Sequence, residues 1–139
     1  MATVIRAEIS EKNKYYIDKH RHYELKHFCL QYPNWKRTYA EIDGGAIATS
    51  SFSRTPSGNL PGDPTGKRAT IKARLSERIE LIEKVAKETD DYIYDYLLKG
   101  VTEGLSYTYL KSRLDMPCGK DMYYDRYRKF FWLLSEMRD

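Results

Sequence analysis

Residues 106–139 constrain the fold of this chain most, because they contain two helical patterns separated by a short break. In the first pattern, Tyr109, Leu110 and Leu114 recur at helical spacing. The break covers residues 115–119, with the sequence DMPCG, in which proline lacks a backbone N–H and glycine tolerates positive φ. These features predict two helices joined by a tight turn.

The second pattern runs from about Lys120 to Met137. Its apolar residues step by three and four positions, which predicts one buried stripe: Tyr123, Tyr127, Phe130, Phe131 and Leu134. Basic side chains stand between these residues, and Ser106 is a favourable N-cap for the preceding helix. A helix, a tight turn and a second helix with a basic outer face are typical of a DNA-binding helix-turn-helix, which we expect at about residues 106–137.

The N-terminal part of the chain predicts a helical arm over residues 1–42. Ser10 is a suitable N-cap for a long helix over residues 11–32. One face of this helix carries Tyr16, His20, Tyr23, His27 and Leu30. Pro33 is expected to stop or kink it before a second piece over residues 35–42. Because an arm of this length cannot bury itself, we expect it to pack on another helix.

Residues 43–66 are rich in Gly, Ser, Thr and Pro and lack a helical period, so we expect a linker there. Asp63 followed by Pro64 marks the start of a long helix over roughly residues 65–88. Its apolar residues recur at helical spacing: Ile71, Leu75, Ile79, Ile82 and Ala86. Its outer face starts with basic residues and then alternates with acidic ones, which we interpret as a solvated face.

A further short helix follows the acidic cap at residues 89–91, and Gly100 and Gly104 are expected to loosen the chain after it. We therefore predict an all-α fold. It has an N-terminal helical arm packed on a long central helix, followed by a C-terminal helix-turn-helix. The expected domains are the arm at 1–42, the linker at 43–66 and a helical DNA-binding domain at 67–139.

Composition and motifs argue against several classes of function. The net charge of +4 is compatible with nucleic acid but does not require it. No apolar run has the length of a signal peptide or a membrane span, so we expect a cytoplasmic protein without membrane contact. Cys29 and Cys118 predict two reduced thiols, and the histidines lack the spacing and acidic partners of a metal site. Because no nucleotide-binding or hydrolase motif occurs, we expect no enzyme, no catalytic residue and no cofactor.

The candidate DNA contacts lie in and near the final helix. Entry into a groove requires an exposed helix N-terminus with side chains that reach the bases, flanked by Arg or Lys for the phosphates. We expect residues 120–129 to enter a major groove, while Lys111, Arg113, Arg128 and Lys129 hold phosphates. The full candidate set is Lys111, Arg113, Lys120, Tyr123, Tyr124, Arg126, Arg128 and Lys129.

The layout as a whole resembles the ArpU/RinA-type regulators of bacteriophages and prophages. The resemblance rests on the segments YYIDKHRHYELKHF, GDPTGKRA, ARLSERIELIEKV, IYDYLLKGV and YLKSRLDMPCGKDMYYDRYRKFFWLLSE. It implies a DNA-binding end similar to region 4 of sigma factors and a role in switching on phage late genes. The matching positions are residues 63–65 and 123–129, whereas the turn at 117–121 departs from the Ser/Thr-rich turn usual in sigma-like members.

Double-stranded DNA is therefore the expected partner, and RNA polymerase and a second copy of the chain are further candidates. Two alternatives remain open. A phage small-terminase-like DNA-packaging subunit also needs a helix-turn-helix but assembles into a ring. A helical protein-interaction module would not bind DNA, so truncating Arg126 and Arg128 would leave its function intact.

Overall fold

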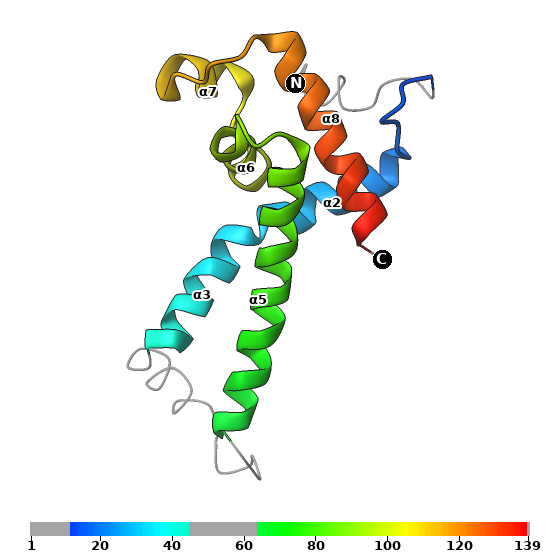
Figure 1. Ribbon diagram of the computed structural model, residues 1–139. Coiled ribbons are helices and arrows are strands. Elements are labelled where there is room, and N and C mark those ends of the chain that lie inside the picture. Colours follow the sequence, from blue (N-terminus) through cyan, green and yellow to red (C-terminus); the bar gives the residue numbers. More distant parts are fainter. Residues whose placement is uncertain (1–11, 45–63, 139) are drawn as a thin grey trace. The chain divides into compact units, whose positions relative to one another are not determined.

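The computed structural model of the chain describes residues 12–44 and 64–138, and these residues are almost entirely helical (Figure 1). The helices are α2 (Lys19–Leu30), α3 (Tyr32–Gly44), α5 (Pro64–Thr89), α6 (Tyr94–Glu103), α7 (Tyr107–Leu114) and α8 (Lys120–Met137). No strand occurs in these two ranges. The predicted all-α fold class is confirmed, and so is the predicted extent of α8.

The contacts divide the chain into two compact units. Among the described residues, one unit contains residues 12–31 and 82–138, and the other contains residues 32–44 and 64–81. Within the first unit, α2 packs with the C-terminal helices α6 and α8. The division falls between α2 and α3 and again within α5, and neither place carries a change of composition.

The first unit is built around α8, with α2 and α6 packed against it and α7 packed against α6. The expected apolar stripe of α8 is buried along its whole length, and Phe130 and Leu134 are fully inaccessible to solvent. Aromatic rings dominate this core, and Tyr127 and Phe130 each make an edge-on contact with Phe131. The prediction of a buried stripe on α8 is confirmed.

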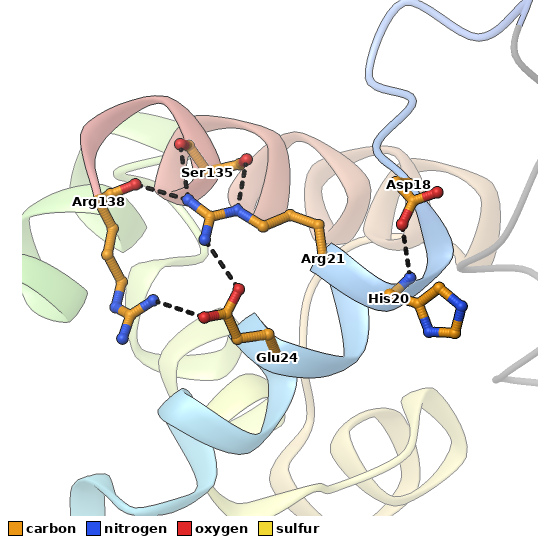
Figure 2. Close-up of polar contacts among 6 residues, drawn as sticks. All are labelled: Asp18, His20, Arg21, Glu24, Ser135 and Arg138. Atoms are coloured by element: carbon orange, nitrogen blue, oxygen red, sulfur yellow. Dashed lines mark hydrogen bonds and ion pairs between the residues drawn. The ribbon is translucent and has the colours of Figure 1, made fainter.

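Helix α2 is shorter than expected and buries a different face. It begins at Lys19, and the carboxylate of Asp18 caps it by accepting a hydrogen bond from the His20 N–H at 2.9 Å (Figure 2). Its buried residues are His22, Leu25, Phe28 and Cys29, whereas His20 and His27 of the expected stripe are exposed. The face that carries the tyrosines and histidines is therefore not the most buried one, because these residues are amphipathic and their spacing alone does not show which side is buried. The expected cap at Ser10 lies outside the described residues.

The second unit contains α3 and residues 64–81 of α5. Helix α3 starts before Pro33, which is tolerated because backbone N–H groups in a first helical turn have no intrahelical partner. Trp35 is buried, as are Leu75 and Ile79 of α5. The predicted apolar face of α5 is thus confirmed. The expected linker is shorter than 43–66, because both of its ends are helical, and residues 45–63 with the cap at Asp63 lie outside the described residues.

Candidate nucleic-acid interface

The turn between α7 and α8 is closed by backbone geometry. Ser106 caps α7 by accepting a hydrogen bond from the Tyr109 N–H at 3.1 Å, as predicted. Helix α7 ends at Leu114, and its C-cap Asp115 adopts the left-handed conformation with φ 59° and ψ 42°. The N–H groups of Asp115 and Met116 both donate to the carbonyl of Leu110, and the Met116 side chain is buried. A left-handed residue with a buried side chain after it is a common way to end a helix sharply.

Side chains of α7 hold the rest of this turn. The Lys111 ammonium donates to the carbonyl of Met116 at 3.0 Å and lies 3.5 Å from the carbonyl of Cys118. The Tyr107 hydroxyl also reaches the Cys118 carbonyl, at 3.5 Å. Lys111 therefore stabilises the turn while it remains exposed, and this structural role was not part of its predicted one.

The N-terminal end of α8 is open. Its N-cap is Gly119, which has no side chain to satisfy the first backbone N–H groups. Lys120, Asp121 and Met122 are all exposed, and Met122 is one of the more exposed large apolar side chains in the described ranges. Asp121 and Met122 were absent from the candidate set. They lie on the face opposite the apolar stripe of α8, so the helical period of that stripe could have indicated from the sequence that they are exposed.

Tyr123 and Tyr124 are placed in the core instead of on an exposed face. Tyr123 is 1% exposed and Tyr124 is 6% exposed. The Tyr123 hydroxyl lies against Gly100 of α6, where a Cβ atom would come within 2.2 Å of it, and it has no hydrogen-bond partner among the described residues. Burial raises the pKa of Tyr123 far above its usual value. Gly100 therefore permits a close approach of α6 and α8, and it does not loosen the chain as expected.

Arg126 is held by two carboxylates. Its guanidinium lies 2.8 Å from Asp90, just before α6, and 2.5 Å from Asp125 of α8. The hydrogen bond from Arg126 to Asp90 is the main reason that the pKa of this guanidinium is raised. Asp90 also accepts hydrogen bonds from the N–H groups of Tyr92 and Ile93, so this one carboxylate joins α8 to the turn before α6.

The remaining candidate cations differ in exposure. Arg128 and Lys129 are half-buried, and the Arg128 Nε atom is buried without a hydrogen-bond partner in the described ranges. Arg113 of α7 is exposed, with its guanidinium 6.0 Å from the Tyr109 ring centroid. The exposed members of the predicted set are thus Lys111, Arg113 and Lys120, and they lie on α7 and at the start of α8.

A pocket of about 210 Å³ lies where α2, α6, α7 and α8 meet. Tyrosines 107, 123, 124 and 127 line it, and Lys26 is its only charged lining residue. Within residues 12–44 and 64–138, no group of three or more His, Cys, Asp or Glu side chains has the arrangement of a metal site. No helix in the same ranges combines the length and apolar character needed to cross a membrane.

Comparisons with known proteins found no matching family model, no matching curated protein and no matching solved structure.

Proposed function

We propose that the protein is a sequence-specific double-stranded DNA-binding regulator that reads DNA with the N-terminal end of α8. One observation carries this proposal. The turn at residues 115–119 is fixed by backbone and Lys111 hydrogen bonds, and it presents an uncapped helix end with an exposed cation at Lys120. A rigidly held, exposed helix N-terminus with flanking cations is what major-groove binding requires.

The exposed side chains at this end suit both kinds of contact with DNA. Lys120 can donate to the O6 and N7 acceptors of guanine, Asp121 can accept from the N4 amino group of cytosine, and the apolar Met122 can contact a thymine methyl group. Arg113 and Lys111 on α7 supply charge for phosphates, and the free N–H groups of the first turn of α8 favour an anion. The buried Tyr123 and Tyr124 and the half-buried Arg126 support this end.

The phage or prophage setting is also part of the proposal, and the resemblance of the sequence to ArpU/RinA-type regulators supports it. A role in late-gene expression, contact with RNA polymerase and self-association belong to the same proposal. A cytoplasmic location would follow from it, since the DNA and the polymerase are there.

A second candidate is a protein-interaction module, and the carboxylates on the outward side of the first two turns of α8 favour it. Asp121 and Asp125 lie on the outward side of the first two turns, beside Met122 and Lys129. An acidic surface with one exposed apolar side chain also suits a basic protein partner. The two candidates differ in whether duplex DNA is bound with sequence preference.

Selection from a duplex library with a random core distinguishes them. The purified chain is incubated with the library at rising NaCl concentrations, and the retained duplexes are sequenced. The regulator is expected to enrich one motif that persists as salt rises, whereas charge-driven contact would fade uniformly without a motif. Absence of retention at low salt would contradict DNA binding and would favour the interaction module.

A further inference from the structure

The helical hairpin formed by α3 and residues 64–81 of α5 carries an exposed basic stripe. The stripe consists of Lys67, Arg74 and Arg78, all of which are exposed. Their spacing of seven and four residues places them within about 40° of one another around the helix axis, over roughly 16 Å of its length. The hairpin as a whole carries seven Lys and Arg against four Asp and Glu in its described residues.

Two cations of α5, Lys72 and Arg78, contact α3, and of these two only Arg78 belongs to the stripe, with its guanidinium 5.5 Å from the ring centroid of Trp35. Lys72 lies 2.6 Å from the Asp43 carboxylate of α3 and 5.2 Å from the ring centroid of Tyr39. In the described parts of the chain, neither Lys67 nor Arg74 forms an ion pair with an acidic side chain. The charges of these two side chains are therefore not neutralised within the hairpin.

Acidic residues of α5 point away from the stripe. Glu77 and Glu80 are turned from its centre by about 80° and 140° around the helix axis. Glu80 also accepts a hydrogen bond from the Ser76 hydroxyl at 2.9 Å, which holds it on its own side. A solvated helix face usually mixes both signs of charge, whereas this stripe has one sign only.

The side chains beside the stripe decide which polyanion it fits. The nearest neighbours around the helix axis are Ile71 and Leu81, each about 40° from the centre of the stripe, and both are half-buried. An amphipathic helix that binds a lipid surface inserts exposed large apolar side chains, and neither of these neighbours is exposed. A row of Lys and Arg without an exposed large apolar side chain in residues 66–81 fits the phosphate oxygens of a nucleic-acid backbone.

We propose that Lys67, Arg74 and Arg78 form a second contact with double-stranded DNA, which is made to the phosphate backbone and is independent of sequence. This inference rests on the proposed function, because it assumes that the protein binds duplex DNA. It adds a surface on the other compact unit of the chain, separate from the helix-turn-helix. Such a surface contributes affinity and salt dependence, and it leaves the choice of sequence to α8.

The test is the salt dependence of binding to a 30-base-pair duplex of mixed sequence. The double variant Lys67→Gln/Arg74→Gln of the full chain is compared with wild type. If each side chain neutralises one phosphate, the slope of log K against log salt becomes shallower by roughly 1.8. The control Lys84→Gln/Lys87→Gln removes two exposed cations from the other part of the same helix and is expected to leave the slope near the wild-type value.

The outcomes separate this inference from the proposed function. If the Lys67→Gln/Arg74→Gln variant binds DNA with the same salt slope as wild type, the second contact is overturned and the helix-turn-helix proposal is left intact. If the slope becomes shallower by the same amount in the Lys84→Gln/Lys87→Gln control, the change is a general effect of net charge, and the second contact is again overturned. If the wild type binds no duplex but binds vesicles with anionic lipid, both proposals fail. Melting temperatures of all variants show whether folding is intact.

Discussion

The two ends of α8 are held in opposite ways. At the C-terminal end, Arg21 of α2 donates to the Ser135 hydroxyl and to the backbone carbonyls of Ser135 and Arg138, at 3.1, 3.1 and 2.5 Å (Figure 2). At the N-terminal end, Gly119 offers no side-chain cap and the first three helical residues are exposed. The unpaired carbonyls of one end are thus satisfied within the chain, whereas the unpaired N–H groups of the other stay available.

A second layer of contacts reinforces the C-terminal end. The Glu24 carboxylate lies 2.9 Å from the Arg21 guanidinium and 3.6 Å from that of Arg138 (Figure 2). The Arg138 guanidinium in turn lies 4.1 Å from the ring centroid of Phe28. Polar side chains of α2 therefore fix the C-terminal end of α8, whereas the backbone N–H groups at its N-terminal end receive no side-chain cap.

The largest expected change in the free energy of unfolding concerns the buried face of α8, which runs along the helix between its two ends. Gly100→Ala places a methyl group 2.2 Å from the Tyr123 hydroxyl and should lower the free energy of unfolding by about 2–3 kcal/mol in urea denaturation. Tyr123→Phe removes that unpaired hydroxyl, so the double variant should recover much of the loss. Strict additivity of the two single changes would contradict this contact.

The next largest effect is expected at the C-terminal end of α8. Arg21→Met removes the donor to the carbonyls of Ser135 in α8 and of Arg138, its C-cap, and should lower the free energy of unfolding by about 2 kcal/mol. Lys19→Met, at an exposed position on the same helix, is the matched control and should change it by less than about 0.5 kcal/mol. Equal effects of the two substitutions would show that the C-terminal contacts contribute little.

Arg126, a predicted DNA contact, is expected to stabilise the fold instead of binding DNA. Arg126→Met breaks the pair with Asp90 and should lower the free energy of unfolding by about 1 kcal/mol. Arg113→Met on α7 should change stability by less than about 0.5 kcal/mol and instead weaken DNA binding. Both quantities are measured on both variants. An Arg126 variant of unchanged stability would return this side chain to the candidate DNA contacts.

The smallest effect concerns pH and Glu24. The hydrogen bond from Arg21 holds the pKa of Glu24 below its ordinary value of 4.5. A depressed folded-state pKa contributes stability that is present above pH 4.5 and is lost as the pH falls through the folded-state value. Wild type should therefore exceed Glu24→Gln in melting temperature at pH 7, and the difference should shrink below pH 4.5. A difference that widens in acid would contradict this sign.

The sequence predicted α5 and α8 well because their buried faces consist of residues with a clear preference. Ile, Leu and Phe at steps of three and four define one face without ambiguity, as Ile79 and Phe130 show. The turn after α7 was predictable as well, since proline and glycine restrict the backbone at positions 117 and 119.

The rest depends on contacts between residues far apart in the sequence. The buried face of α2 was missed because its Tyr and His residues suit either side of a helix, and only packing on α8 decides between them. Arg126 was predicted to face DNA because nothing local indicates that Asp90 lies 2.8 Å away. Tyr124 was predicted to be exposed because it adjoins the apolar stripe, and its burial follows from the packing around it.

Equilibrium binding by an Arg113→Ala/Lys120→Ala variant tests the central claim most directly. The duplex is the motif recovered by selection, compared with a scrambled duplex at the same salt concentration. We expect affinity for the motif to fall at least about tenfold, while the free energy of unfolding stays within about 0.5 kcal/mol of wild type. Unchanged affinity for the motif, in a variant that is fully folded, would show that the open end of α8 does not bind DNA.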